Sequence, residues 1–142
     1  MNRAKLRALL ELNEGRRNKV YKDSLGYDTI GIGHLMSRPI SDAAVDQIFA
    51  DDLAEHEAEL RELCPWIDEH DEVRQAALID LCFNLGRTKL AQFKNTLGAF
   101  RVKAYEAAAL GLEQSRWFTQ VGKRGPRIVK MVRTGAWPAE LG

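Results

Sequence analysis

Apolar residues recur at helical spacing at the start of the chain, and a strand-like pattern follows. Across residues 2–13 the leucines recur at three- and four-residue spacing, which predicts an amphipathic helix that Gly15 ends. Residues 18–35 are rich in β-formers around one polar turn, which predicts a hairpin or small sheet. Gly31 and Gly33 alternate with isoleucines there and leave one strand face open to a close neighbour.

Everything after Pro39 is predicted to be helical. Ser41 is expected to cap a helix that runs to about residue 62. Asp71 is expected to cap another over 72–85, which Gly86 ends. That second helix is apolar nearly all round, which predicts a buried, central position. Shorter helices are predicted near 95–101, 103–111, 114–121 and 126–134, the last with Pro126 in its first position.

The order of these elements predicts an α+β architecture. A small N-terminal lobe that contains the strands is joined by a long helix to a helical C-terminal lobe. At 142 residues the chain is expected to form one domain, with lobes of roughly 13–62 and 63–142 plus the N-terminal helix. A hydrophobic fraction of 45% supplies a core and excludes a disordered chain.

The chain shows no pattern typical of export or membrane insertion. No stretch approaches the roughly 20 apolar residues of a membrane span. The first residues alternate basic and apolar side chains and lack the continuous apolar core of a secretory signal. We therefore expect no signal peptide, no membrane insertion and synthesis in the cytoplasm of a host cell.

Charge is distributed unevenly along the chain. Residues 91–142 hold 9 Lys/Arg against 3 Asp/Glu and carry a net charge of +6, whereas the remainder carries −5. A basic half attracts anionic polymers, either nucleic acid or an anionic cell wall. Solvated helix faces with unequal charge explain the same numbers, so the charge alone does not choose between these interpretations.

The two cysteines predict neither a metal site nor a disulfide. Cys64 and Cys82 match no metal-ligand spacing, and Cys82 lies in an apolar run where a buried, inert thiol is expected. Nothing marks the chain for an oxidising compartment. We expect both thiols to be free.

Glu14 and Asp23 are candidates for catalysis by a pair of carboxyl groups. Splitting a glycosidic bond requires one protonated carboxyl group to donate to the leaving oxygen and one carboxylate to activate water or attack the sugar. The two groups need contrasting surroundings. Glu14 follows an apolar helix and Asp23 follows Lys22 in a polar turn. Most acid pairs at such spacing are solvated surface residues, so the spacing alone does not identify a catalytic pair.

The sequence around these acids closely resembles the active-site segment of the T-even phage lysozymes, the muramidases of glycoside hydrolase family 24. The family pattern is an acid before Gly, a Tyr-Lys-Asp turn, and then Gly-Tyr-x-Thr-Ile-Gly-Ile-Gly-His. Residues 14–34 contain all of it in order. The resemblance implies an α+β two-lobed lysozyme-like fold and one catalytic domain over 1–142. It also implies hydrolysis that inverts the anomeric configuration.

The resemblance assigns roles to individual residues. It implies that Glu14 is the general acid, that Asp23 positions or activates water, and that Thr29 helps to hold that water. It also implies a structural ion pair between His34 and Asp52. Asp52 shares a helical stripe with apolar residues, where an unpaired carboxylate is unusual. Substrate contacts are implied at Gly33, Leu35, Asn84 and Arg124, although a solvated charge is an equally good interpretation of Arg124.

Further matches extend to the C-terminus, and one region departs from the family. Trp117 and Trp137 lie in two C-terminal signatures and can stack on sugars, but we expect both to be packing residues. Only six residues separate His34 from Ser41, where the T-even phage lysozymes carry a longer excursion. The small lobe is therefore trimmed, which leaves the number of sugar subsites open.

We therefore expect an endolysin that cleaves the β-1,4 bond between N-acetylmuramic acid and N-acetylglucosamine of a peptidoglycan strand. It is expected to act as a monomer, without metal, cofactor, nucleic acid or membrane. A lytic transglycosylase needs one acid and no activated water, so Asp23 and Thr29 argue against it. A non-catalytic helical protein that binds the cell wall or nucleic acid remains the alternative from another class.

Overall fold

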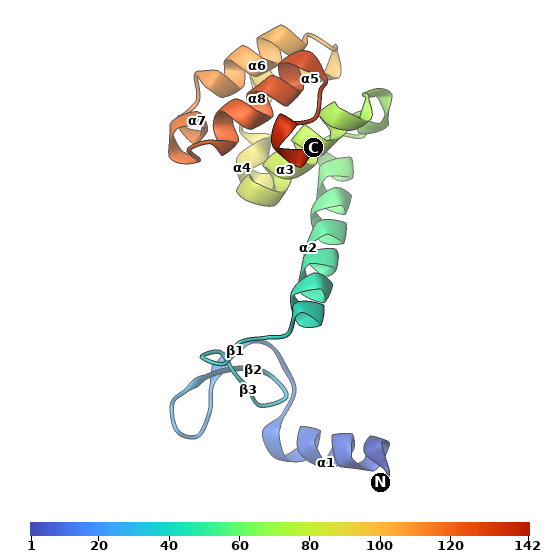
Figure 1. Ribbon diagram of the computed structural model, residues 1–142, viewed down its shortest axis with the longest axis vertical. Coiled ribbons are helices and arrows are strands. Elements are labelled where there is room, and N and C mark those ends of the chain that lie inside the picture. Colours follow the sequence, from blue (N-terminus) through green and yellow to red (C-terminus); the bar gives the residue numbers. More distant parts are fainter. The chain divides into compact units, whose positions relative to one another are not determined.

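A computed structural model describes all residues 1–142 and divides them into two units, Met1–Asp46 and Gln47–Gly142, each of which is described by itself (Figure 1). Helices predominate, and the strands form one small antiparallel sheet in the first unit. This confirms the expected α+β, lysozyme-like fold. In chain order the elements are α1 (Arg3–Glu14), β1 (Arg17–Lys22), β2 (Asp28–Gly31), β3 (His34–Leu35), α2 (Asp42–Leu63), η1 (Ile67–Glu69), α3 (Glu72–Leu85), α4 (Arg87–Ala91), α5 (Lys94–Arg101), α6 (Tyr105–Glu113), α7 (Arg116–Gln120), α8 (Arg124–Thr134) and η2 (Ala139–Leu141).

Helix α1 has a defined cap at each end. The Asn2 side chain accepts a hydrogen bond from the Lys5 amide, which satisfies one of the free N–H groups of the first turn. Gly15 ends the helix with a φ of 78°, a backbone conformation that favours glycine. The predicted helix and its stop at Gly15 are confirmed.

The three strands form a sheet in the order β1-β2-β3, with both pairs antiparallel. Thr29 occupies the middle of the sheet, opposite Tyr21 of β1 and Leu35 of β3. An ion pair of 2.6 Å between Lys22 and Asp28 closes the turn that joins β1 to β2. The sequence predicts this small sheet, and the structure confirms it.

Helix α3 lies at the centre of the second unit, as its apolar pattern predicts. The Asp71 carboxylate accepts from the Arg74 amide at 3.0 Å to cap the helix, and Gly86 ends it. The buried core of the unit also draws on α5, α6 and α8, which lie side by side in Figure 1. The fully buried side chains of this core include Leu60, Leu78, Leu81, Phe100, Leu112 and Val132.

Ion pairs join the helices that enclose this core. Arg133 of α8 contacts Glu106 at 2.7 Å and Glu113 at 2.6 Å, both from α6. These two carboxylates raise the pKa of the Arg133 guanidinium, and the same hydrogen bond holds the pKa of Glu106 below its usual value. Arg74 donates to the carbonyls of Val132 and Arg133 and so fixes the end of α8 to the start of α3.

The structure corrects two details of the predicted helices. The short helix α4 was not predicted, because five residues with one buried leucine are too short for a periodic pattern. Helix α8 begins at Arg124, so Pro126 is its third residue and not its first. Proline is compatible with both positions, because the first N–H groups of a helix have no intrahelical partner. The Ser41 cap of α2 is confirmed by a hydrogen bond of 3.2 Å from the Ala44 amide.

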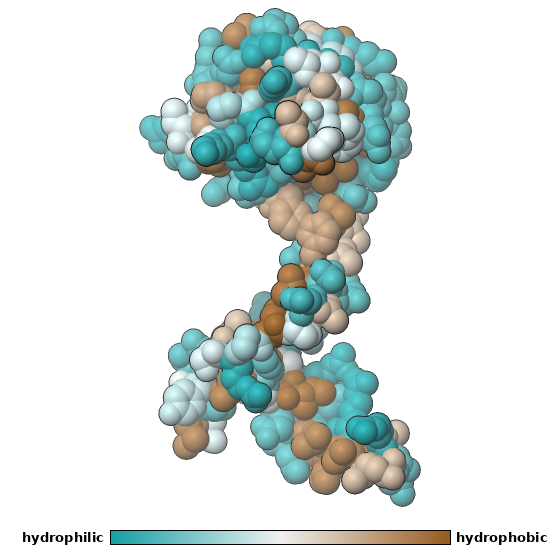
Figure 2. Space-filling view, in the orientation of Figure 1, coloured by the Kyte–Doolittle hydropathy of each residue, from teal (hydrophilic) through white to brown (hydrophobic).

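The surface of the second unit is mostly hydrophilic on the face in Figure 2, whereas hydrophobic side chains gather over α1 of the first unit. Leu9, Leu10 and Leu12 are the exposed leucines of that helix. None of the helices combines the length and the apolar character that crossing a lipid bilayer requires.

Candidate active site

Glu14 is the last residue of α1, and its side chain lies against Gly33. A Cβ atom at Gly33 would lie 3.0 Å from Glu14 Oε2 and 3.1 Å from its carboxyl carbon, so the carboxyl group occupies the space that a side chain would fill. Gly33 has a φ of 70°, which favours glycine independently of this contact. The sequence predicted an open strand face at Gly33, and here Glu14 uses it.

Asp23 begins the turn between β1 and β2, and its carboxylate organises that turn. Asp23 Oδ1 accepts hydrogen bonds from the amides of Leu25 at 2.9 Å and Tyr27 at 2.8 Å. The Asp23 amide in turn donates to the Tyr27 carbonyl. Because both side-chain bonds go to Oδ1, Oδ2 retains its lone pairs for another donor, such as water.

Thr29 lies directly after this turn and is 2% exposed. Its hydroxyl donates to the Tyr27 carbonyl at 2.9 Å. With its proton used in this way, the hydroxyl oxygen can only accept a further hydrogen bond. Tyr27 therefore connects the two candidate residues, because its amide holds Asp23 and its carbonyl orients Thr29.

These three residues come from one unit, where they lie at the end of α1, in the turn between β1 and β2, and in β2. The arrangement offers a carboxyl group at the end of a helix, a carboxylate fixed by backbone amides, and an oriented hydroxyl group. Such a set can donate a proton and hold or activate a water molecule. Glu14 is exposed, however, so the first unit does not provide the apolar surroundings expected for this side chain from the sequence.

The first unit also contains His34 and Leu35, which together form β3. The Nε2 atom of His34 is buried there and has no hydrogen-bond partner within the unit. Asp52, the partner implied by the resemblance, belongs to α2 in the second unit. The His34–Asp52 pair therefore stays a prediction, as does the substrate contact at Leu35.

In the second unit, the side chain of Asn84 accepts a hydrogen bond from Trp117. The Trp117 indole Nε1 donates to Asn84 Oδ1 at 2.8 Å, and Trp117 is 3% exposed. The predicted packing role of Trp117 is confirmed. That of Trp137 is wrong, because 47% of this residue is exposed. Trp137 follows the end of α8 in an irregular segment, where the chain leaves the core.

Arg124 lies at the start of α8 and has a defined partner. Its Nε donates to Asp80 Oδ1 at 2.8 Å, and both side chains are about one-third exposed. The two residues line a hollow of about 440 Å³ together with Phe49, Leu53, Glu57, Ala76, Ile79 and Phe83. Of the two interpretations left open for Arg124, a freely solvated charge is wrong, and the substrate contact stays a prediction.

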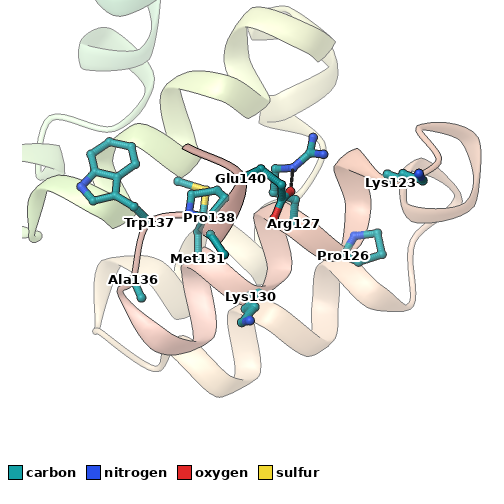
Figure 3. Close-up of a pocket in the computed structure, with 10 residues that line it drawn as sticks. Lys123, Pro126, Arg127, Lys130, Met131, Ala136, Trp137, Pro138 and Glu140 are labelled. Atoms are coloured by element: carbon teal, nitrogen blue, oxygen red, sulfur yellow. Dashed lines mark hydrogen bonds and ion pairs between the residues drawn. The ribbon is translucent and has the colours of Figure 1, made fainter. Parts of the chain in front are cut away.

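A second hollow of the same unit, of about 240 Å³, lies between α8 and the C-terminal segment (Figure 3). Arg127 crosses it to pair with Glu140 at 2.9 Å. Trp137 lies at one end of the hollow and Lys123 at the other (Figure 3). Lys123, Arg127 and Lys130 contribute positive charge to its lining, and Glu140 pairs with one of them. The uneven charge and Trp137 were the sequence signals for this surface.

This α+β fold, with Glu14 at a helix end and Asp23 in the turn after β1, is compatible with the lysozyme family that the sequence resembles. The family model described as phage lysozyme matches residues 11–133 of this chain. The chain therefore belongs to the phage lysozyme family, and it is a lysozyme-type enzyme.

Curated relatives agree with this family. The chain is similar to a probable T4-type lysozyme 2 of Dictyostelium discoideum, with 26% identity over 163 residues that cover 92% of this chain and 94% of the relative. It is also similar to the pre-baseplate central spike protein of Enterobacteria phage T4, with 29% identity over 89% of this chain and 27% of that protein. A peptidoglycan hydrolase of Pseudomonas phage phiKMV is 28% identical over 82% of this chain and 14% of its own length.

Proposed function

We propose that this lysozyme hydrolyses the β-1,4 bond between N-acetylmuramic acid and N-acetylglucosamine in bacterial peptidoglycan, with inversion at the anomeric carbon. Glu14 donates a proton to the leaving oxygen. Asp23 accepts a proton from the attacking water through Oδ2, and Thr29 orients that water. One chain supplies all three groups, so a monomer is sufficient for this mechanism, and the chemistry needs no metal or cofactor.

The observation that supports this mechanism best is the double use of Tyr27. Its amide fixes Asp23 Oδ1, and its carbonyl takes the Thr29 proton, so a carboxylate oxygen and a hydroxyl oxygen are both left as acceptors. Two acceptors suit a water molecule that must lose a proton as it attacks. In a retaining enzyme the second carboxylate attacks the sugar itself and no such water is held in the first step.

Two substitutions test the assignment, each with a control at a neighbouring acid. Glu14→Gln removes the proton and keeps the shape of the side chain. Glu11→Gln changes a partly exposed acid one turn earlier in α1 that pairs with Arg7. Clearing of chloroform-treated Gram-negative cells is the assay. We expect Glu14→Gln to lose about 10²–10⁴-fold in rate and Glu11→Gln to keep wild-type activity. Full activity in Glu14→Gln would overturn the mechanism.

Asp23→Asn is paired with Asp28→Asn, which removes the ion pair with Lys22 across the same turn and so controls for a general weakening of that turn. We expect a large loss of activity only in the former. The stereochemistry is read by proton NMR of fresh digestion products, where the α anomer appears first if the reaction inverts. First appearance of the β anomer would contradict inversion. Anhydro-sugar ends in mass spectra would instead identify a lytic transglycosylase.

A further inference from the structure

Three side chains capable of binding a metal converge from α2 and α3 in the second unit. His56 and Glu59 lie one turn apart on α2, and Cys82 lies near the end of α3. One ligand atom from each residue, a nitrogen, an oxygen and a sulfur, falls within 4.8 Å of the other two. The proposed catalytic residues Glu14, Asp23 and Thr29 all belong to the first unit, and none of them is a member of this cluster.

Contacts with α3 hold the His56 ring in place. The ring lies 5.0 Å from that of Phe83, centroid to centroid. The Cys82 thiol donates a long hydrogen bond of 3.6 Å to the His56 carbonyl, so the sulfur lies beside the same residue of α2. The imidazole is therefore positioned by packing and not by a hydrogen bond.

The Nδ1 atom of His56 is buried and has no hydrogen-bond partner. Glu59 Oε2 lies 3.5 Å from it, without the geometry of a hydrogen bond. Buried polar atoms without a partner are rare, so such an atom calls for an explanation. A separation of 3.5 Å is also the spacing of two ligand atoms on one tetrahedral metal ion, given bond lengths of about 2.0–2.3 Å.

We propose that His56, Glu59 and Cys82 bind a Zn²⁺-class divalent cation, with water as the fourth ligand. One imidazole, one carboxylate and one thiolate form a mixed set of the kind that zinc accepts, whereas Mg²⁺ and Ca²⁺ prefer oxygen ligands alone. The bound ion connects α2 to α3 within the second unit. This inference uses none of the proposed catalytic residues, and it does not depend on the proposed mechanism.

Access and charge are consistent with this site. Cys82 is fully buried, but the side chains that lie beside it, His56 and Glu59, are 24% and 33% exposed. The ion reaches the sulfur when the His56 and Glu59 side chains rotate and coordinate the ion. Of the other charged groups nearby, Arg87 lowers the pKa of Cys82 and is itself paired with Glu62.

Metal binding requires one proton to leave. Burial, and then the negative charge of Glu59, raise the pKa of the Cys82 thiol, so sulfur is protonated in the metal-free protein at neutral pH. On binding, the S–H proton passes to solvent, sulfur donates an electron pair to the ion, and Glu59 and neutral His56 donate theirs. The thiolate and carboxylate balance the two positive charges of the cation.

Cobalt titration of the full chain tests the site, because a thiolate bound to Co²⁺ absorbs in the near ultraviolet. Chelator-treated, reduced protein is titrated with CoCl₂ under nitrogen. We expect an absorption band that saturates at one equivalent, disappears on addition of ZnCl₂ and persists in excess MgCl₂. We also expect Zn²⁺ to raise the melting temperature, because it binds the folded state.

Variants identify the ligands. Cys82→Ser should abolish the band, and Glu59→Gln should weaken Co²⁺ binding at least about tenfold, since loss of a supporting residue alone commonly costs that much. Glu59 is partly exposed, so its variant remains informative if a change at buried Cys82 impairs folding. Cys64→Ser is the matched control, because Cys64 is equally buried but is not in the cluster.

The result that supports the proposal is a band that survives in Cys64→Ser and fails in the cluster variants. An absent band in wild-type protein would overturn it, because it would mean that His56 and Glu59 form an ordinary ion pair beside a buried thiol. Unchanged affinity in Glu59→Gln, or loss of the band in Cys64→Ser, would overturn the ligand set.

Discussion

The Trp117 indole donates a hydrogen bond of 2.8 Å to the Asn84 side-chain oxygen and thereby joins α7 to the last turn of α3. This bond fixes the amide plane of Asn84, so its NH₂ group points away from the indole and remains a donor. The residue that the family resemblance links to substrate is thus oriented by a buried aromatic side chain.

Trp117→Phe removes the N–H donor and part of the ring. We expect the free energy of unfolding to fall by about 2 kcal/mol, from the lost hydrogen bond and the imperfect filling of the space. Urea denaturation measures the change. Trp137→Phe is the control, because Trp137 is half exposed, and it should shift the midpoint little. An equal loss in both variants would show that the hydrogen bond contributes nothing specific.

Gly33→Ala and Gly31→Ala form a matched pair. Their φ values are 70° and 67°, so alanine is strained equally at both, by about 1–2 kcal/mol. Only the new methyl group at residue 33 meets an obstacle, which is the carboxyl group of Glu14, since nothing lies within 4 Å at residue 31. We expect similar melting temperatures but at least about a tenfold larger loss of lytic activity in Gly33→Ala, because small misplacements of reacting groups are costly. Equal activities would show that the position of Glu14 does not depend on Gly33.

His70 makes the stability of the second unit depend on pH. It is 5% exposed, and its Nδ1 lies 2.7 Å from the Tyr105 hydroxyl. Burial, and then the positive charge of Lys103, lower the pKa of its imidazole below the ordinary 6.5, while Asp71 and Glu69 oppose this effect. As the pH falls below that value, the unfolded chain binds the proton before the folded chain does, so the stability contribution present above pH 6.5 is lost.

Thermal melts of wild type and His70→Gln between about pH 7.5 and 5.5 test this effect, because the substituted residue does not titrate. We expect the wild-type melting temperature to decrease more steeply over this window. Parallel curves for the two proteins would mean that another group causes the pH dependence. The comparison of slopes remains valid even if the variant is less stable throughout.

Arg74 combines roles that lysine cannot reproduce. It donates to the carbonyls of Val132 and Arg133, pairs with Asp71 at 3.0 Å, and its guanidinium lies 3.7 Å over the Tyr105 ring. We expect Arg74→Lys to lower the free energy of unfolding by about 2 kcal/mol. An ammonium group cannot donate to both carbonyls and stack on the Tyr105 ring at the same time. Arg101→Lys, at the exposed end of α5, serves as the control. Chemical denaturation that gave equal midpoints for these two variants would contradict the prediction.

The sequence predicts those features that depend on local rules. Asp71 and Gly86 fix both ends of α3, and its apolar character predicts a central position, because these signals act within a few residues. Glu14, Asp23 and Thr29 were identified from one short segment, and all three belong to the first unit. Their roles in catalysis stay proposals that rest on the family resemblance and the observed geometry.

Features that depend on distant residues could not be predicted in this way. The contact between Glu14 and Gly33 arises from a left-handed glycine at a strand connection, and no periodicity reports a φ value. The side chains of His56 and Cys82 are brought together by the packing of α2 on α3, so no metal-ligand spacing marks them. The exposure of Trp137 was also missed, because residue type alone favours burial.

The buried thiol of Cys64 provides a native reporter of conformational opening. Burial raises its pKa to about 11, so the group is both covered and protonated at neutral pH and does not react with alkylating reagents in the closed state. The rate at which iodoacetamide labels Cys64 therefore measures how often its surroundings open. Labelling followed by mass spectrometry would give the opening free energy of this region without any introduced probe.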